Sequence, residues 1–162
     1  MTFRENNEKY SVSFGENNTC ILTKVGKSEW IGILCENEFE KQREYKLKIK
    51  LLKNQFHHIR VGIVPKDYDT DLSNFYSCGC WYYSYYGSLY SGPPYNYSNK
   101  QAGLSKINKE IIMVVDTSKG TLKFIIDNVD KGVSFSNIQV DKNYVFVIFL
   151  YDVGDSVEVS EC

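Results

Sequence analysis

The chain has 162 residues, of which 43% are hydrophobic, and its 19 basic and 20 acidic side chains leave a formal net charge of -1 at pH 7. A chain of this length fits one ordinary domain and can bury a sizeable core. The balanced charge provides no basic field for phosphate backbones or anionic lipid, so we expect neither nucleic acid nor a membrane as a partner. Aromatic residues make up 15% of the chain and proline occurs only 3 times, which favours pleated strands over disorder.

The beginning of the chain and its cysteines indicate an intracellular protein. Residues 1–9 contain no apolar segment of the kind found in a signal peptide, and no later run is long enough for a membrane helix. The 5 cysteines are odd in number and scattered, unlike a disulfide framework. We therefore expect free thiols and a cytoplasmic or other intracellular location.

The first half of the chain contains several segments with strand patterns. Residues 19–24 and 29–34 are candidate strands between turn-forming residues. Residues 45–51 alternate strictly, with Leu47 and Ile49 on the apolar face and three lysines on the other. Residues 56–64 alternate in the same way before Pro65, and we interpret 45–51 and 56–64 as neighbouring antiparallel strands.

The middle of the chain is dense in aromatic residues. Residues 78–86 read as a strand, and residues 87–94 supply Gly, Ser and Pro in turn-forming density, which predicts a strand pair with a rigid loop. Alternation along this strand should divide its rings between core and surface. The aromatic residues concerned are Trp81, Tyr82, Tyr83, Tyr85, Tyr86, Tyr90, Tyr95 and Tyr97.

The last third of the chain predicts four strands joined by tight turns. They are residues 111–115, residues 121–127, the very apolar residues 144–151, and a last strand marked by Val157 and Val159. The turn at residues 116–120 makes the first two a hairpin. No segment shows convincing helical periodicity, so these short strands predict an all-β sandwich.

Several of these segments resemble the SPRY domain, in order and at the spacing of that family. The matching stretches are Tyr45-Lys46-Leu47-Lys48-Ile49, Ile59 to Pro65, Gly79-Cys80-Trp81-Tyr82-Tyr83, Ser88 to Gly92, Met113 to Phe124, Asp130 to Ile138 and Leu150 to Val159. The Gly-Trp motif departs from the family pattern by one inserted cysteine, Cys80. The resemblance is strongest from residue 113 onward and covers residues 45–160.

The resemblance implies a fold and a function. The expected fold is a bent two-sheet antiparallel β-sandwich of the concanavalin A-like jelly-roll group, as one domain over residues 1–162 with residues 1–44 packed on the same sandwich. The expected function is that of a non-enzymatic protein-interaction module without cofactor or metal. It would bind a partner peptide or loop through its inter-strand loops, as an adaptor or as the substrate receptor of a ubiquitin ligase.

The partner-binding residues are expected in three loops. A rigid sheet scaffold holds such loops in place, and tyrosine combines a large contact area with a polar tip. The expected contact residues are Asp67, Tyr68, Asp69, Asp71 and Tyr76 in the first loop, Tyr95 and Tyr97 after the Pro93-Pro94 pair, and Tyr151 and Asp152 at the end of a strand. The last two could equally form a simple turn.

Alternative chemistry finds weaker support in the sequence. Residues 67–78 lack the glycine and glutamate of a calcium loop, which leaves a looser cation site or a solvated acidic loop at its carboxylates. Cys78 and Cys80 lack the further ligands of a zinc site, and His57 and His58 have no nucleophile motif beside them. Two alternative functions remain: a constitutive subunit of a larger assembly, and a lectin-like sandwich that stacks sugar rings on exposed aromatic side chains.

Overall fold

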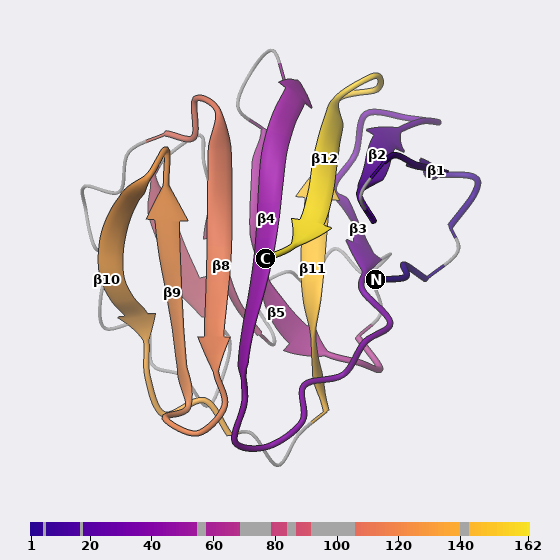
Figure 1. Cartoon of the computed structure of the whole chain (residues 1–162). Coiled ribbons are helices and arrows are strands. Elements are labelled where there is room, and N and C mark those ends of the chain that lie inside the picture. The colour runs from indigo at the N-terminus through magenta and orange to yellow at the C-terminus, as the bar shows by residue number, and fades with distance from the viewer. Residues whose placement is uncertain are drawn as a thin grey trace.

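A computed structural model gives the fold of the chain (Figure 1). The structure describes residues 1–4, 6–16, 18–54, 58–68, 79–83, 87–91, 106–139 and 143–162, with the backbone alone at residues 80–83 and 91. None of these described residues is helical, so none forms a helix that could cross a membrane. The expected strand at residues 78–86 and the expected turn-forming segment at residues 87–94 are therefore described only in part.

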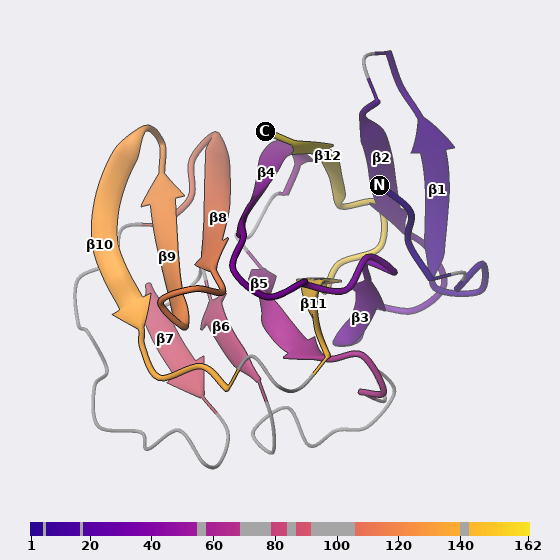
Figure 2. The same ribbon diagram turned by 60° about the horizontal axis from the view of Figure 1, so that its bottom comes forward.

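Twelve strands form two antiparallel sheets within the described part of the chain. The seven-stranded sheet has the order β1 (Tyr10–Phe14), β2 (Cys20–Lys24), β12 (Ser156–Glu161), β4 (Glu44–Lys53), β8 (Glu110–Asp116), β9 (Thr121–Ile126) and β10 (Val129–Phe135). The five-stranded sheet has the order β3 (Ile31–Leu34), β11 (Tyr144–Leu150), β5 (Ile59–Pro65), β6 (Cys80–Tyr83) and β7 (Ser88–Ser91). The two sheets lie face to face as a β-sandwich (Figures 1 and 2), which confirms the expected fold class. The strands of residues 1–44 belong to these same sheets.

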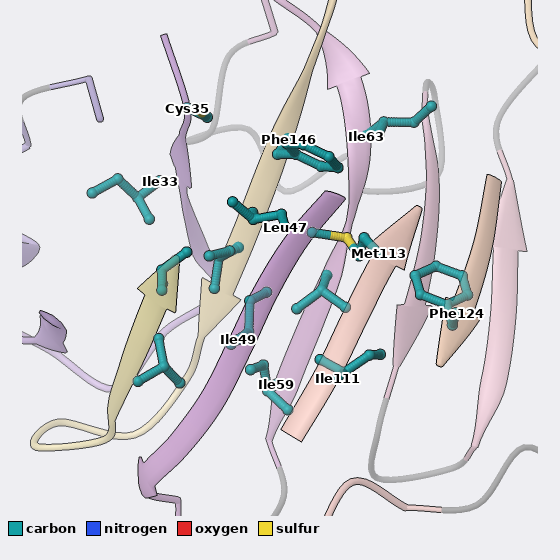
Figure 3. Packing of buried hydrophobic residues seen from close by; sticks show 14 of the residues in the cluster. Ile33, Cys35, Leu47, Ile49, Ile59, Ile63, Ile111, Met113, Phe124 and Phe146 are labelled. Carbon is teal, nitrogen blue, oxygen red and sulfur yellow. The ribbon is translucent and has the colours of Figure 1, made fainter. Parts of the chain in front are cut away.

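The main core lies between the two sheets and follows the alternation of the sequence. Leu47 and Ile49 of β4 are at most 1% exposed, as are Val61 and Ile63 of β5 and Phe124 of β9. Figure 3 shows labelled members of this cluster projecting from strands of both sheets into the space between them. The inward faces predicted for these strands are confirmed, because every second side chain of a strand points to the same face.

A second cluster covers the outer face of the five-stranded sheet. It contains Leu34 of β3, Val64 of β5 and Val147 and Phe149 of β11, together with Tyr68. All seven residues of β11 are buried, because its even-numbered side chains face the main core and its odd-numbered ones face this second cluster. A continuous apolar run is typical of a strand covered on both faces.

Two expectations about strands are wrong, and one strand was not expected. β4 and β5 are not neighbours: β4 pairs with β12 and β8 in one sheet, whereas β5 pairs with β11 and β6 in the other. The segment from residue 111 to 159 forms five strands rather than four, because β10 continues the β8–β9 hairpin along the edge of the sheet. The chain also has a strand before residue 19, since β1 pairs with β2 at the other edge.

Candidate interaction surface

Three ring-bearing residues meet at one end of the five-stranded sheet because of the register of β11. Leu150, its last residue, pairs with Ile31 of β3 on one side and with Ile59 of β5 on the other. All three side chains are buried, and those of Ile59 and Leu150 belong to the main core. Strand alternation therefore turns the adjacent residues Tyr151, Trp30 and His58 toward the outer face.

The three rings pack as a compact triangle. The ring centroids of Trp30 and Tyr151 lie 5.1 Å apart, those of His58 and Tyr151 5.5 Å, and those of Trp30 and His58 6.2 Å. Arg60, two residues along β5 from His58, places its guanidinium carbon 3.9 Å from the centroid of the Trp30 ring. Such stacking orders a charged side chain that would otherwise be free to move.

Asp152 extends this group with a polar contact. Its Oδ2 lies 3.1 Å from Nδ1 of His58, and the two side chains are 25% and 27% exposed. All five residues, namely Trp30, His58, Arg60, Tyr151 and Asp152, are half-buried. We call these five residues the aromatic platform. Each side chain is therefore partly exposed to solvent, with the Arg60 guanidinium stacked on Trp30 and the Asp152 carboxylate beside His58.

The backbone beneath the aromatic platform is fixed by Tyr10. The Tyr10 hydroxyl donates a hydrogen bond to the carbonyl of Ile31 at 2.7 Å and accepts one from the amide of Leu150 at 2.9 Å. The side chain is fully buried, and this burial raises the pKa of its phenol far above the usual range. Tyr10 therefore joins the residues next to Trp30 and Tyr151 through a neutral, permanently protonated hydroxyl.

The turn that carries Asp152 is also held by hydrogen bonds. The amide of Lys24 donates to the carbonyl of Asp155, and the amide of Gly154 donates to the carbonyl of Lys24, each at 2.9 Å. The amide of Val153 donates to the hydroxyl of Ser28 at 3.3 Å. Because several segments hold the turn, Tyr151 and Asp152 form part of a preordered surface rather than an independent loop.

The residues expected to contact a partner do not all lie together. Tyr151 and Asp152 belong to the aromatic platform. Asp67 is exposed, but it follows the far end of the seven-residue strand β5, which at about 3.3 Å per residue spans roughly 20 Å from the platform end. Five further residues, Asp69, Asp71, Tyr76, Tyr95 and Tyr97, lie outside the described residues.

Tyr68 requires a correction as an expected surface contact. Its side chain is only 7% exposed and packs with Val64 and Val147 in the second cluster. The amide of Tyr68 closes a turn onto the carbonyl of Pro65 at 3.0 Å, which directs the chain back over the sheet. Tyr68 therefore supports the fold at this position, and the surface proposed below does not include it.

Other sequence candidates can be placed only in part. Asp67 is the one described carboxylate of the segment 67–71, so the looser cation site lies mostly outside the described residues. Within the described part of the chain, no group of three or more His, Cys, Asp or Glu side chains is arranged to hold a metal ion. Of the rings in the aromatic segment, Tyr90 is described, and it packs half-buried against the second cluster.

Two antiparallel sheets, with the preordered aromatic platform at one end, form an all-β sandwich in the described part of the chain. Comparison with solved structures identifies the fold more closely: the chain has the fold of SPRY domains. It is similar to the SPRY domain of human HERC1, at 18% identity and a TM-score of 0.68 over 97% of this chain and 96% of that one. It is also similar to another human SPRY domain, at 14% identity and a TM-score of 0.63 over 98% and 96% of the two chains.

A third similar structure is the TRIM65 PSpry domain, at 12% identity and a TM-score of 0.62 over 97% of this chain and 92% of that one. No family model matches the sequence, and no curated protein matches it significantly. The fold is thus shared with SPRY domains at low sequence identity, and the expected resemblance is confirmed at the level of structure.

Proposed function

We propose that this chain is a protein-interaction module that binds a peptide or loop of its partner on the aromatic platform. The observation that supports this most directly is the composition of the platform. Trp, Tyr and Arg are the residue types that most often dominate the binding energy of protein interfaces. All three are present, and Trp30 contacts both Tyr151 and Arg60.

The order of the aromatic platform also supports binding. Rings that already pack against each other lose little conformational freedom when a partner covers them, so more of the contact energy appears as affinity. The Tyr10 hydroxyl and the hydrogen bonds of the 152–155 turn hold the backbone in place before any partner arrives. The platform therefore resembles a preformed half of an interface.

The state of the described cysteine thiols favours a binding role over a catalytic one. Of the three cysteines whose side chains are described, Cys20 and Cys35 are at most 3% exposed and Cys162 is exposed, and desolvation raises the pKa of all three thiols. A protonated, buried thiol is a poor nucleophile. We therefore propose a non-enzymatic role, in which the chain serves as an adaptor or as the substrate receptor of a ubiquitin ligase.

The experiment that tests this function is quantitative affinity purification with a matched pair of variants. Trp30→Ala combined with Tyr151→Ala removes two rings of the aromatic platform. Phe14→Ala removes an aromatic side chain that is 77% exposed on β1, away from the platform, and serves as the control. Circular dichroism and thermal unfolding establish that each variant is folded.

We expect the platform variant to lose its specific partners by at least about tenfold and the Phe14 variant to retain them, because hot-spot truncations typically cost 2 kcal/mol or more. Ligase subunits among the lost partners would support the adaptor role. A stoichiometric set of partners that neither variant changes would contradict the proposal and favour a constitutive subunit. If the platform variant loses signal on a glycan array but loses no protein partner, the result would favour the lectin-like alternative.

A further inference from the structure

A cavity of about 330 Å³ opens at the end of the sandwich opposite the aromatic platform. Cys35 lies just beyond the last residue of β3, and Phe146 lies near the start of β11, whereas the platform lies at the other end of both strands. The cavity reaches from these residues to the first half of β4 and the end of β12. Figure 2 shows the connection between β3 and β4 crossing from one sheet to the other at this end.

The inner wall of the cavity is formed by aromatic and aliphatic side chains. Phe39 packs edge-on against Phe146 with ring centroids 4.7 Å apart, and it lies 5.0 Å from the ring of Tyr45. Leu47 completes this wall from β4. Figure 3 shows Leu47 and Phe146 among the buried side chains of the main core. Phe39 and Tyr45 are half-buried, whereas Phe146 and Leu47 are at most 5% exposed, so the wall exposes mainly parts of the first two rings with the main core behind them.

The connection between β3 and β4 forms the outer wall of the cavity. Hydrogen bonds hold this connection to three parts of the fold. The amide of Phe39 donates to the carbonyl of Tyr144 at 3.1 Å, and the amide of Glu40 donates to the hydroxyl of Tyr45 at 2.7 Å. The hydroxyl of Thr117 accepts a hydrogen bond from the amide of Arg43 at 2.9 Å. A ligand would meet a cavity that is already formed, which lowers the entropic cost of binding.

The charged side chains that line the cavity are all engaged in ion pairs. Arg43 pairs with Glu40 and Lys46 pairs with Glu44, each at 2.9 Å. Two other lining carboxylates pair with cations beside the cavity, Glu38 with Lys66 and Glu161 with the amino group of Met1. A charged ligand would have to compete with these pairs, whereas a neutral ligand would leave them intact.

The Tyr45 hydroxyl supplies a polar group that such a ligand can use. Its oxygen accepts the hydrogen bond from Glu40, and its own proton remains able to donate. Binding cavities commonly combine apolar walls with a few polar groups that fix orientation, and their volumes begin at about 300 Å³. The cavity therefore has the size, the apolar wall and the directional donor of a small-molecule site.

We propose that this cavity binds a small uncharged molecule that contains a planar ring and a hydrogen-bond acceptor. The ring lies against Phe39 and Phe146, and the acceptor receives the proton of the Tyr45 hydroxyl. This site is separate from the aromatic platform, so the proposal holds whether or not the platform binds a protein.

The test uses three probes that share one ring and differ in charge, namely benzamide, benzoate and benzylamine. Each is titrated into the isotope-labelled chain while backbone amide shifts are followed by NMR. We expect benzamide to shift the amides of Cys35, Phe39 and Tyr45 in a saturable way. Benzoate and benzylamine should bind at least about fivefold more weakly, because each must disturb an existing ion pair.

Phe39→Ala is the test variant and Phe135→Ala is its matched control. Both phenylalanines are partly buried and pack against the main core, but Phe135 does not line the cavity. Loss of one ring contact should weaken benzamide binding about fivefold to tenfold in the Phe39 variant. The Phe135 variant should stay within about twofold of the unchanged chain.

Three results would overturn the proposal. One is the absence of saturable shifts at these amides with benzamide. Another is equal binding of the three probes, which would remove the argument from charge. The third is equal loss of benzamide binding in both variants, which would indicate a general effect on the core rather than a contact in the cavity.

Discussion

The hydroxyl of Tyr10 accepts a hydrogen bond from the amide of Leu150, which lies 140 residues away in the sequence, at 2.9 Å. The same hydroxyl donates to the carbonyl of Ile31. A side chain of β1, in the seven-stranded sheet, therefore joins the ends of two strands of the five-stranded sheet. Because Ile31 and Leu150 adjoin Trp30 and Tyr151, this contact links the packing of the sandwich to the aromatic platform.

Tyr10→Phe should destabilise the chain, because it keeps the buried ring and removes only the hydroxyl. The carbonyl of Ile31 and the amide of Leu150 would each lose this partner inside the protein, at a cost of about 1–3 kcal/mol in the free energy of unfolding. Urea denaturation measures the change. Tyr45→Phe is the control, because the hydroxyl of this half-buried residue accepts a hydrogen bond from the amide of Glu40, and its loss should cost less than about 1 kcal/mol. Equal costs for the two variants would contradict this role of Tyr10.

Gly32→Ala should destabilise the outer face of the five-stranded sheet. A methyl group at this position would lie 2.6 Å from Cε1 of Phe149, whose ring is fully buried in the second cluster. The ring must move in a packed environment, which typically costs about 1–3 kcal/mol. Thermal or urea unfolding measures the loss.

A double-mutant cycle separates this contact from a backbone effect. Phe149→Leu shortens the side chain that the new methyl group would meet. In that background Gly32→Ala should cost less than it does alone, by at least about 0.5 kcal/mol. If the two changes are additive, the cost at Gly32 does not come from Phe149 and the explanation is wrong.

Asp116 should contribute to stability in a pH-dependent manner. Hydrogen bonds from the side chains of Lys119 and Ser118, with a further bond from the Lys119 amide, hold the pKa of this carboxyl far below its usual range. A pKa that is lower in the folded than in the unfolded state stabilises the fold while the carboxyl is ionised. The contribution is therefore complete above the unfolded pKa of about 4 and is lost as the pH falls below it.

The measurement is the difference in unfolding free energy between pH 7 and pH 3. This difference should shrink in Asp116→Asn, because the amide does not titrate. In Lys119→Met the pKa of Asp116, followed by carboxyl NMR, should rise toward its usual value, since the first of its hydrogen-bond partners is gone. An unchanged pH dependence in Asp116→Asn would show that other carboxylates carry the effect.

Much of the fold was predictable from single segments of the sequence. The alternation of residues 45–51 identified both the strand β4 and its inward face, and the very apolar residues 144–151 identified β11. The two edge strands were missed because their patterns are weak. Phe14 on β1 is 77% exposed, and Val129 and Val133 on β10 are each 53% exposed, so neither strand shows a clear apolar face.

Strand partners were harder to predict than strands. β4 and β5 follow each other and alternate alike, which suggested neighbouring antiparallel strands, yet they belong to different sheets. Periodicity reports which face of a strand is buried and says nothing of its neighbours. The aromatic platform was found only in part for the same reason. Tyr151 stands out at the end of an apolar strand, whereas Trp30 and His58 join it only through the pairing of β11 with β3 and β5.

Thr117→Val should loosen the connection that forms the outer wall of the cavity. The Thr117 hydroxyl accepts from the amide of Arg43 and donates to the carbonyl of Glu40 at 2.8 Å, and the side chain is only 4% exposed. Valine has nearly the same shape but lacks the hydroxyl, so the unfolding free energy should fall by about 1–2 kcal/mol and the Arg43 amide should exchange faster with solvent.

Thr19→Val is the matched control for this last prediction. The Thr19 hydroxyl makes one local hydrogen bond to the carbonyl of Glu16 at the exposed β1–β2 turn, so its loss should cost less than about 0.5 kcal/mol. Hydrogen exchange followed by NMR gives both the global and the local effect. If Thr117→Val slows or leaves unchanged the exchange of Arg43, the connection is held by its other contacts, the amide of Phe39 on Tyr144 and that of Glu40 on Tyr45. Faster exchange confined to residues 40–43 would instead show that Thr117 keeps the cavity wall in place, and benzamide binding should then weaken in the same variant.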